Sequence, residues 1–516
     1  MNSPQQSRIC IPICESTVAA LESAIAGAVK VSDLIEVRLD CLQKNELETG
    51  ASRITEVLKR TDCESILTLR PAEQGGQGQL DDETRQAFWS DAIFSESLFD
   101  VELELAEHFN SAGSPHTLPI DWSRTICSQH DFAGVPRNLD QIYERMISTP
   151  ARILKFAVMA QDATDCLPVF HLLARARSEG REMIAIAMGS AGIATRILGP
   201  SRGSFLTYGS SENDAGTAPG QVSVRDLREV YRLEQIDHQT QVFGVIGLPI
   251  SHSLSPCVHN AAFAALGKNA VFLPLEVHDV KAFLKRMVIP RTRELDWNLR
   301  GLSVTAPHKF TVMEQLDWVE PAAQEIGAVN TIVIKDDALH GFNTDASGFI
   351  TPLVQKFGDL TGVRCAVIGA GGAAKAVVWA LKQAGAQVTI CARELARGQL
   401  LAEHFGVAGI KLEDARFNEF DVVINTTPLG TAGKFENETA VTGEGLRGAR
   451  LAYDLVYNPN ETRFLREARE AGCETLGGLP MFVAQATEQF RLWTGDAAPA
   501  DVMYEAAQQG LLRSQI

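Results

Sequence analysis

Short hydrophobic runs recur along the first 235 residues, and most of them are separated by segments with a helical pattern. Eight runs resemble strands, from RICIPIC at residues 8–14 to SFLTYG at residues 204–209, and VSVRDLREVYRLEQ at residues 222–235 resembles a closing helix. Strands that alternate with helices are typical of a parallel sheet. Eight such units in this length favour a (β/α)8 TIM barrel, with a doubly wound open sheet as the alternative.

The pattern changes after residue 235. The polar run QIDHQTQ, residues 235–241, is interpreted as a short linker, and a new strand begins at QVFGVIG, residues 241–247. Further strand and helix units extend to about Asp345. A glycine-rich strand–turn–helix then occupies residues 363–385, and the strand QVTICAR follows it. The second half is therefore predicted to hold a small α/β domain and a dinucleotide-binding domain.

Composition and charge argue against several classes of function. The chain has 516 residues, a formal net charge of −17 and a pI of about 5.2. Such a chain repels nucleic acid and anionic membranes, so neither is expected as a partner. No run approaches the roughly 20 apolar residues of a membrane span, and the N-terminus lacks a secretory pattern. The ten cysteines form no CxxC pair and no zinc-like cluster, so we expect free thiols, no metal and a cytoplasmic protein.

The glycine-rich turn carries a dinucleotide-binding pattern in a suitable context. Gly369, Gly371 and Ala374 fit G-x-G-x-x-G/A between an apolar strand and a helix. The first glycine permits the tight turn, and the second lets a pyrophosphate approach the backbone at the helix N-terminus. These features predict a bound dinucleotide.

Two arginines near the end of the next strand bear on the choice of dinucleotide. An NAD-selective site usually has a carboxylate there, which binds the ribose diol. Arg393 and Arg397 instead suit the 2′-phosphate of NADP. Because Glu394 lies between them, NAD remains the alternative to the expected NADP.

Dense polar motifs lie outside the nucleotide-binding segment. GLPISHSLSPCVHN, LSVTAPHK, GAVNT and GFNTDASGF offer hydroxyls, amides and one Lys/Asp pair that suit a polyhydroxylated substrate. A lysine near a carboxylate can relay a proton while a hydride moves to or from a carbonyl. With GAGGAAKA, INTTPLG, YDLVYNP and GGLPMFVAQA, these motifs make the half from about residue 241 closely resemble shikimate dehydrogenase.

The resemblance implies a module of two domains. The substrate-binding domain would span residues 242–345 plus about 485–516, and an NADP-binding Rossmann domain would span residues 346–484. Lys309 and Asp345 would be the catalytic pair. Shikimate or 3-dehydroshikimate would also be bound by Ser253, Ser255, Thr305, Asn330, Tyr457 and Gln485. The cofactor would be bound by Gly369, Gly371, Gly372, Ala373, Arg393, Arg397, Thr427, Gly478 and Met481.

Two positions depart from the pattern of that family. Ser303 occupies a position where the family commonly has Asn, which puts one substrate hydrogen bond in question. The sequence CARE occupies the place of Asn-Arg-Thr, so that only Arg393 matches directly. Oxidation of quinate with NAD is therefore an alternative activity for this half.

One cation interrupts the strand-like run ARILKFAVMA, residues 151–160. An unpaired Lys155 would be costly to bury, but its face of the strand could line a barrel interior, where active sites lie toward the strand ends. A buried lysine near other cations has a lowered pKa and can attack a ketone to form an iminium, which is an electron sink. His130 has a suitable proton affinity to remove the adjacent proton and protonate a leaving hydroxyl. Other strand ends and loops offer Glu36, Arg38, Asp40, Arg70, Arg196, Thr217 and Gln221.

These residues predict dehydration of a β-hydroxy ketone acid without a metal. In EVRLD, LRPAEQGGQ, SQHDF, LKFAVMA, IAMGSAGIATR and APGQVSVRDL, the first half resembles type I 3-dehydroquinate dehydratase over about residues 8–235. The resemblance implies a barrel domain over residues 1–236, a Schiff base on Lys155 and acid/base catalysis by His130. Arg196 would bind the substrate carboxylate. The remaining pocket residues would be Glu36, Arg38, Arg70, Met188, Tyr208, Thr217 and Gln221.

One acid of that family is missing from this sequence. The glutamate of R-x-x-x-E-G-G falls on Gln74, which can orient His130 by hydrogen bonding but supplies no charge. We therefore predict a lower pKa for His130 than in relatives that carry the glutamate. Glu73 is one residue away and is expected to point elsewhere.

The two halves resemble consecutive enzymes, because 3-dehydroshikimate is the product of the first and the substrate of the second. We expect a fused bifunctional enzyme of the shikimate pathway that converts 3-dehydroquinate to shikimate with NADPH. A metabolite-binding regulator without catalysis is the other alternative. Retention of Lys155, His130, Lys309 and Asp345 argues against it. The oligomeric state does not follow from the sequence.

Overall fold

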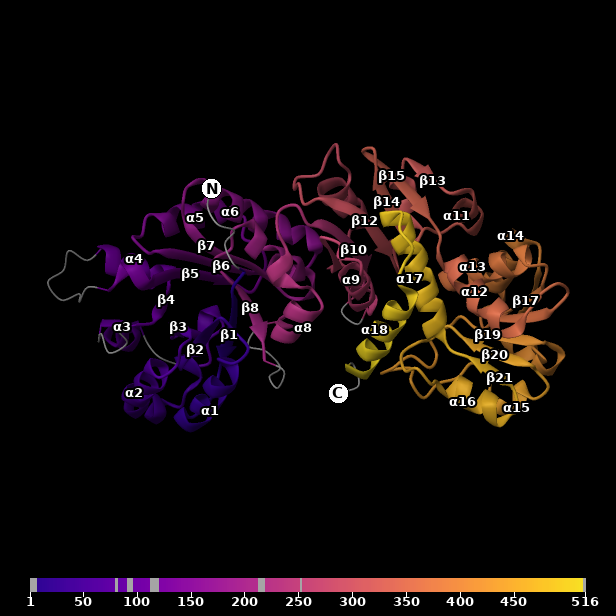
Figure 1. The fold of residues 1–516 in the computed structure, drawn as a ribbon, viewed down its shortest axis with the longest axis horizontal. Coiled ribbons are helices and arrows are strands. Elements are labelled where there is room, and N and C mark those ends of the chain that lie inside the picture. Colours follow the sequence, from indigo (N-terminus) through magenta and orange to yellow (C-terminus); the bar gives the residue numbers. More distant parts are fainter. Residues whose placement is uncertain are drawn as a thin grey trace. The chain divides into compact units, whose positions relative to one another are not determined.

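The computed structural model describes residues 7–78, 82–90, 96–111, 120–211, 219–250 and 253–513. The chain forms two compact units, the first made by Met1–Thr240 with Leu275–Asp279 and the second by Gln241–Pro274 with Val280–Ile516. Figure 1 shows the elements of both units. Within the described ranges, no helix is long and apolar enough to cross a membrane.

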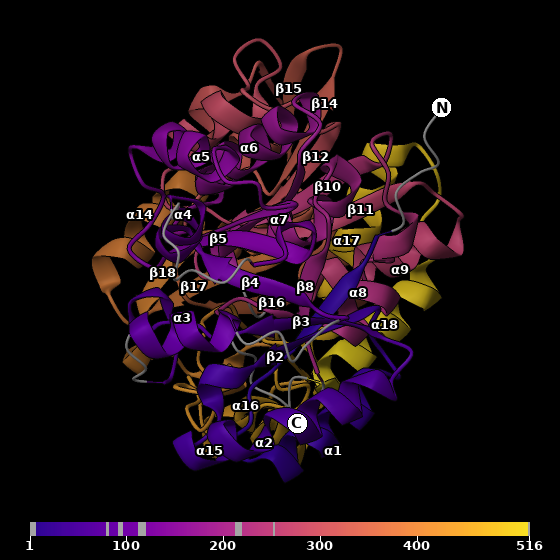
Figure 2. The same ribbon diagram turned by 90° about the vertical axis from the view of Figure 1, so that its left-hand side faces the viewer.

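The first unit is built around parallel strands, several of which are labelled in Figure 2, and these strands form a closed sheet. Hydrogen-bonded neighbours follow the order β7-β6-β5-β4-β3-β2-β1-β8. A parallel bridge from Met183 in β7 to Ser204, just before β8, joins the two edges, and the Phe205 N–H donates to Met183 O at 2.8 Å. This closure confirms the predicted (β/α)8 barrel and excludes the open sheet. The strands are β1 (Ile9–Ile13), β2 (Leu34–Arg38), β3 (Glu64–Thr68), β4 (Leu98–Glu102), β5 (Thr125–Asp131), β6 (Ile153–Met159), β7 (Glu182–Met188) and β8 (Thr207–Ser210), with a short β9 (Val222–Ser223) paired to β8.

Helices alternate with the strands of this unit, as the sequence pattern predicted. They are α1 (Val18–Ala28), α2 (Lys44–Lys59), α3 (Asp82–Ser90), α4 (Leu103–Ser111), α5 (Leu139–Ile147), α6 (Cys166–Ser178), α7 (Ile193–Leu198) and α8 (Val224–Glu229). The last of these is shorter than the predicted closing helix. Arg232 has a left-handed backbone with φ of 52°, which is incompatible with continuing the helix to residue 235.

The barrel interior changes from apolar to polar toward the carboxyl ends of the strands. A buried cluster at the lower level includes Leu98 in β4 and Ile153 in β6. Asp100 and Lys155 lie two residues further along the same strands, and strand side chains alternate, so they share the inward face. The polar site therefore rests on a hydrophobic floor.

The first unit contains a disulfide between Cys14, directly after β1, and Cys41, at the end of a 3-10 turn after β2. The expectation that every thiol is free is therefore wrong for these two residues. Strands β1 and β2 are parallel neighbours, with Ile13 opposite Val37, so their carboxyl ends bring the two sulfurs together. No sequence motif marks that pairing. The other eight cysteines form no disulfide.

The second unit contains two sheets of six strands each. The first sheet is mixed and has the order β11-β10-β12-β14-β15-β13. Strands β12 and β14 pair antiparallel, as do β14 and β15, while β10 and β12 are parallel. The strands are β10 (Gln241–Gly247), β11 (Ala270–Glu276), β12 (Leu299–Val304), β13 (Trp318–Val319), β14 (Thr331–Lys335) and β15 (Ala338–Phe342).

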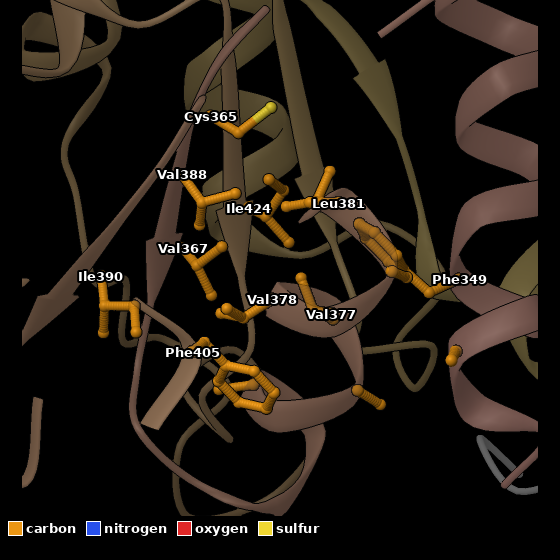
Figure 3. Close-up of a cluster of buried hydrophobic side chains, with 14 of the residues drawn as sticks. Phe349, Cys365, Val367, Val377, Val378, Leu381, Val388, Ile390, Phe405 and Ile424 are labelled. Carbon is orange, nitrogen blue, oxygen red and sulfur yellow. The ribbon is translucent and has the colours of Figure 1, made fainter. Parts of the chain in front are cut away.

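The second sheet of this unit is parallel and has the order β18-β17-β16-β19-β20-β21. This is the doubly wound order of a dinucleotide-binding fold, with the topological switch at β16 and β19. Figure 3 shows its core, where Val377 and Leu381 of α13 lie near Val367 of β16 and Ile424 of β19. The strands are β16 (Arg364–Ile368), β17 (Gln387–Ala392), β18 (Ala408–Lys411), β19 (Val422–Asn425), β20 (Leu451–Asp454) and β21 (Glu474–Leu476).

Two helices of the second unit, α12 and α17, pack against each other at close range. At Gly348 of α12, an added Cβ would come within 2.6 Å of Gln485 Cβ and 2.9 Å of Gln485 N, so only glycine fits there. This approach brings Gln485 next to the start of α12. The helices are α9 (Ser255–Ala265), α10 (Val280–Phe283), α11 (Pro321–Ile326), α12 (Asp345–Phe357), α13 (Gly372–Gln383), α14 (Leu395–Phe405), α15 (Gly443–Leu446), α16 (Arg463–Glu470), α17 (Gly478–Thr494) and α18 (Ala500–Arg513).

Two candidate active sites

The ammonium group of Lys155 lies inside the barrel with three acceptors around it. Its Nζ donates to Asp100 Oδ2 at 2.8 Å, to the Tyr208 hydroxyl at 2.8 Å and to Glu36 Oε2 at 3.3 Å. The side chain is only 5% exposed, so an unpaired charge would be strongly destabilising there. From the sequence, we expected other cations beside this lysine. The structure adds two carboxylates in direct contact with it, and these ion pairs compensate the burial.

Asp100, in β4, is a site residue that the sequence reading missed. It is fully buried, and its Oδ2 also accepts from Arg70 Nη2 at 2.6 Å. Burial raises the pKa of Asp100, but the charges of Arg70 and Lys155 lower it by more and hold it well below its usual range. A signal was present in the sequence, because the acidic residues Asp100 and Glu102 of β4 are separated by one residue, as the charged residues of β2 are.

His130 lies near the carboxyl end of β5. Burial and the charges of Arg70 and Lys155 hold the pKa of His130 well below its usual range, so its ring is neutral at pH 7. Gln74 Oε1 accepts the main-chain N–H of His130 at 3.0 Å, whereas the ring Nδ1 has no hydrogen-bond partner within the described residues. Gln74 therefore positions the strand backbone. The expected hydrogen bond from Gln74 to the imidazole is not formed, because the Gln74 oxygen accepts from the main chain.

Two arginines of the barrel differ in how their charge is balanced. Arg38 makes a bidentate pair with Asp40 at 2.9 and 2.7 Å. Arg196 is buried, contacts no carboxylate within the described residues, and donates to Pro219 O at 3.2 Å. Burial lowers the pKa of Arg196 to about 10. A buried guanidinium without a counter-ion is suited to an anionic ligand.

One cavity, here called the barrel cavity, brings the predicted residues of the first half together. The predicted Thr217 lies outside the described residues, so its place is not assigned. Gln74 and the aromatic ring of Phe132 also line this cavity. The predicted residues that line it are Glu36, Arg38, Arg70, His130, Lys155, Met188, Arg196, Tyr208 and Gln221.

A second cavity, of about 400 Å³, lies in the second unit. The structure brings the predicted catalytic pair and substrate residues together here. Ala373, Gly478 and Met481, which were predicted to contact the cofactor, line the same cavity, so it joins the substrate side to the nucleotide side. The predicted substrate and catalytic residues that line it are Ser253, Ser255, Thr305, Lys309, Asn330, Asp345, Tyr457 and Gln485.

Lys309 and Asp345 form an ion pair in this second cavity, with 2.5 Å between Nζ and Oδ2. Asn330 Nδ2 donates to the other carboxylate oxygen of Asp345 at 2.8 Å. Asp345 is the first residue of α12, where the helix dipole favours a negative charge. Asn343, another polar residue of the motif, accepts the N–H groups of Asp345 and Ala346 and so supports the helix start. The Asp345 carboxylate therefore holds the Lys309 ammonium at the wall of the cavity.

Hydroxyl groups surround the same cavity. Ser255 is the first residue of α9, and its N–H donates to Ser253 Oγ at 3.3 Å. Tyr457 stacks on Phe482 with 4.8 Å between ring centroids. Burial raises the pKa of Tyr457, so its hydroxyl is protonated at neutral pH and available as a hydrogen-bond donor.

Ser303 accepts a hydrogen bond from Gln489, which was not predicted as a site residue from the sequence. Gln489 is fully buried, and its Nε2 donates to Ser303 Oγ at 3.1 Å and to Thr331 Oγ1 at 3.1 Å. The Ser303 oxygen accepts in that bond, so its own hydrogen remains available to the cavity that it lines. No motif links residues so far apart in the sequence.

The glycine turn has the shape that a pyrophosphate requires. Gly369 has φ of 113°, and an added Cβ would come within 2.7 Å of Thr426 Oγ1 and 3.1 Å of Thr427 Cγ2. Gly371 precedes the first residue of α13, Gly372, so the helix N-terminus opens onto this turn. An added Cβ at Gly371 would have nothing within 4 Å, which leaves the backbone accessible. These residues fit a dinucleotide.

The two arginines after β17 are not equivalent. Arg397 pairs with Glu394 at 3.0 Å, and both side chains are mostly exposed. Arg393 is exposed and forms no ion pair within the described part of the chain. Arg393 therefore has the more available charge for a 2′-phosphate.

The first unit is a barrel with a buried lysine, and the second has a Rossmann fold beside a polar cavity. These features define the class of protein as an enzyme with a lyase site and an oxidoreductase site in one chain. Residues 9–238 match the family described as type I 3-dehydroquinase. Residues 245–332 match the shikimate dehydrogenase substrate binding domain, and residues 353–438 match shikimate / quinate 5-dehydrogenase. Residues 478–508 match the shikimate 5′-dehydrogenase C-terminal domain.

Similar proteins cover the whole chain or its second half. A chloroplastic bifunctional 3-dehydroquinate dehydratase/shikimate dehydrogenase of Arabidopsis thaliana is 34% identical over 527 residues, which span 97% of this chain and 84% of that protein. The chain therefore belongs to the family of bifunctional 3-dehydroquinate dehydratase/shikimate dehydrogenases. A shikimate dehydrogenase (NADP(+)) of Caldanaerobacter subterraneus is 41% identical over 52% of this chain and 98% of that protein. A shikimate dehydrogenase crystallised in complex with NADP+ is 36% identical, has a TM-score of 0.50, and covers 54% of this chain and 97% of its own.

Proposed function

We propose that the barrel converts 3-dehydroquinate to 3-dehydroshikimate, and that the second unit reduces this product to shikimate with NADPH. The observation that supports this most directly is that one chain holds two sets of chemically competent groups. One is a buried lysine beside a neutral histidine and an unpaired arginine, and the other is a Lys/Asp pair beside a dinucleotide turn. The first set suits a carbonyl acid, and the second suits hydride transfer.

In the barrel, we propose that the Lys155 amine attacks the substrate ketone and forms an imine with loss of water. The imine acidifies the adjacent carbon, and neutral His130 takes the proton from it. The electron pair of that C–H bond forms a carbon–carbon double bond, and the β-hydroxyl leaves as water with the proton from His130. Arg196 binds the carboxylate, since its guanidinium has no other anion within the described residues. Hydrolysis of the imine then returns the lysine.

In the second cavity, we propose that Lys309 donates a proton to the carbonyl oxygen as it becomes a hydroxyl. Asp345 holds the ammonium in place, and in the reverse direction the neutral Lys309 amine takes the proton back from the hydroxyl. The nicotinamide dinucleotide, when bound, supplies or accepts the hydride. Its phosphates would lie at the turn of Gly369 and Gly371 and at Arg393.

The domain boundaries remain proposals. We propose a barrel domain over residues 1–236, a substrate-binding domain over residues 242–345 plus about 485–516, and an NADP-binding domain over residues 346–484. The last boundary falls inside α17, so that helix belongs to both parts.

We also propose a cytoplasmic location, which cell fractionation with an antibody to the chain would test.

Direct assays of the purified chain test the proposed function. With 3-dehydroquinate alone, the enone of 3-dehydroshikimate should appear, and added NADPH should be consumed with formation of shikimate. Borohydride added during turnover should leave a reduced adduct on the Lys155 peptide, detectable by mass spectrometry. Failure to form either product would contradict the proposal. Faster oxidation of quinate with NAD than of shikimate with NADP would instead favour the alternative activity.

Replacing Gln74 with Glu should shift the acid limb of the dehydratase pH–rate profile to higher pH. A carboxylate near His130 favours the protonated ring and raises its pKa, so the neutral base is lost at a higher pH as the solution is acidified. An opposite charge at this range shifts a pKa by about 1–3 units. The pH–rate profile of kcat/KM measures the shift. Glu73→Gln is the matched control, because Glu73 is exposed while Gln74 is buried, and an unmoved limb in Gln74→Glu would contradict the prediction.

Replacing Gln489 with Glu should raise the KM for shikimate by about tenfold. A buried carboxylate accepts hydrogen bonds, so it would take the Ser303 hydrogen that otherwise faces the cavity. Steady-state kinetics with shikimate and NADP measure the change. Ser303→Ala should raise KM similarly, and Gln489→Glu should then add little. Two fully additive effects would show that Gln489 acts independently of Ser303.

Replacing Glu394 with Gln should increase the preference for NADP over NAD by about two- to fivefold, the range expected for an exposed ion pair. The change removes a negative charge near the 2′-phosphate and frees Arg397. The ratio of the two kcat/KM values measures it. Glu419→Gln is the control, because Glu419 forms a similar exposed pair with Arg416 elsewhere in this unit. An unchanged or lower ratio in Glu394→Gln would contradict the prediction.

A further inference from the structure

Every hydrogen of the Lys155 ammonium has an acceptor in the barrel. An ammonium group has three hydrogens, and the nitrogen has three contacts, with Asp100, Tyr208 and Glu36. These acceptors come from three strands, β4, β8 and β2, so the nitrogen is held from three sides. The protonated lysine is therefore fully satisfied before substrate enters.

Formation of an imine changes this arrangement. The ammonium and the ketone become a protonated imine and one water, as the carbon–oxygen double bond is replaced by a carbon–nitrogen double bond. Two nitrogen hydrogens leave with the ketone oxygen in that water, and one stays on the nitrogen with the positive charge. Atoms and charge balance without an added oxidant or reductant. The imine nitrogen can therefore donate a hydrogen bond to only one of the three acceptors.

Two of the acceptors are less suited to retain that hydrogen. Glu36 Oε2 lies 3.3 Å from the nitrogen, further than the other two acceptors, and its second oxygen accepts the Thr68 hydroxyl at 2.6 Å. Tyr208 lies close, but burial raises its pKa well above the usual range, so its hydroxyl carries no negative charge. Neither offers a close and fixed charge to the imine.

Asp100 combines a close contact with a fixed negative charge. Its Oδ2 lies 2.8 Å from the lysine nitrogen, and Arg70 Nη2 donates to the same oxygen at 2.6 Å. Its side chain is fully buried, so it cannot turn toward solvent. Its second oxygen has no hydrogen-bond partner within the described residues. We propose that Asp100 is the counter-ion of the protonated imine on Lys155.

A counter-ion at this position would strengthen the electron sink. An opposite charge at hydrogen-bond distance favours the protonated form of the imine and raises its pKa by about 1–3 units. The protonated imine accepts the electron pair released when His130 removes the adjacent proton far better than a neutral imine does. This inference rests on the proposed dehydratase reaction and identifies the residue that keeps its intermediate charged.

Charges from the other walls of the barrel act on the same nitrogen. Arg70 lowers the pKa of the imine, and its positive charge would be less well balanced if Asp100 were neutral. Removal of Asp100 alone should therefore leave a more cationic environment. The titratable and charged groups around Lys155 and Asp100 are Cys10 on β1, Glu36 and Arg38 on β2, Arg70 after β3, Glu102 on β4, His130 on β5 and Tyr208 on β8.

Asp100→Asn tests the proposal through the alkaline limb of the dehydratase pH–rate profile. Loss of the counter-ion should move this limb to lower pH by about 1–3 units. At a fixed pH above the limb, the rate should fall by about tenfold for each unit of that shift. Imine formation should persist at lower pH, because the substitution leaves the lysine as a nucleophile. Borohydride should therefore still give an adduct on Lys155 at low pH. As the pH is raised, the adduct yield of the variant should decline at a lower pH than that of the wild type.

Ser128→Ala is the matched control. Ser128 lies opposite Lys155 on the neighbouring strand and accepts from Arg70 Nη1 at 2.7 Å, but it carries no charge. The alkaline limb should stay in place in this variant. An unmoved limb in Asp100→Asn, with a wild-type adduct yield, would overturn the proposal. A wild-type chain that forms no adduct would instead contradict the imine mechanism itself.

A second measurement covers the case in which Asp100→Asn does not fold, as judged by near-ultraviolet circular dichroism. Wild-type protein labelled with ¹⁵N at the lysine side chains is mixed with 3-dehydroquinate, and the imine nitrogen resonance is followed as the pH is raised. The resonance should keep the position of a protonated imine through neutral pH and change only at the alkaline limb of the wild-type pH–rate profile. A change to the neutral-imine position at neutral pH would overturn the proposal.

Discussion

Replacing Lys155 with Arg should abolish the dehydratase activity and the borohydride adduct, while the reduction of 3-dehydroshikimate continues. A guanidinium remains protonated in proteins and cannot attack a ketone. The loss should be on the order of 10⁴- to 10⁶-fold, the scale on which an enzyme loses activity without its nucleophile. Product formation from 3-dehydroquinate and adduct mass spectrometry measure it. Dehydrogenase activity in the same sample reports that the second unit is intact.

Arg is the informative substitution because it preserves the charge in the barrel. Asp100 and Glu36 both contact the lysine nitrogen, and a neutral side chain would leave two buried carboxylates with less compensation. Lys155→Met should therefore lower the thermal stability of the barrel as well as its activity. Substantial turnover in Lys155→Arg would show that the reaction does not require an imine at this residue.

Replacing Lys309 with Met should reduce the dehydrogenase kcat by about 10²- to 10⁴-fold, the usual contribution of a general acid or base. The ammonium that protonates the reacting oxygen is removed, whereas the hydroxyl and amide groups that bind the substrate remain. Oxidation of shikimate with NADP measures kcat and KM separately. The dehydratase activity should be unchanged.

Lys281→Met is the control for this second substitution. Lys281 forms an exposed ion pair with Glu314 at 2.7 Å and does not line the cavity of Lys309. It should keep wild-type dehydrogenase kinetics. If Lys309→Met raised KM and left kcat unchanged, Lys309 would bind the substrate without transferring the proton, which would contradict the proposed role.

Much of the barrel was predictable because strand side chains alternate. Lys155 shares a strand face with Ile153 and Ala157, so a (β/α)8 interpretation placed it inside. The same alternation applied to β4 would have placed Asp100 inside. It was missed because no motif singled out that strand, and the contact that makes it important joins residues on two strands that are not neighbours.

Other features could not be inferred from spacing along the chain. Gln489 supports Ser303 through a bond between a helix near the end of the chain and a strand in the first sheet of the second unit. Cys14 and Cys41 meet because β1 and β2 are adjacent and parallel. Gln74 contacts the backbone of His130 and not its ring, which depends on where a loop side chain turns.

The sequence by itself determined the two folds, the motifs of both sites and the identity of the lysines in them. These properties depend on local periodicity and on residue types at short spacing, which a linear chain displays directly. The tertiary structure alone decided which charges surround each lysine, which arginine lacks a counter-ion and which cysteines pair. Those properties depend on distances between segments far apart in the chain, and electrostatic and hydrogen-bond energies change over a few ångströms.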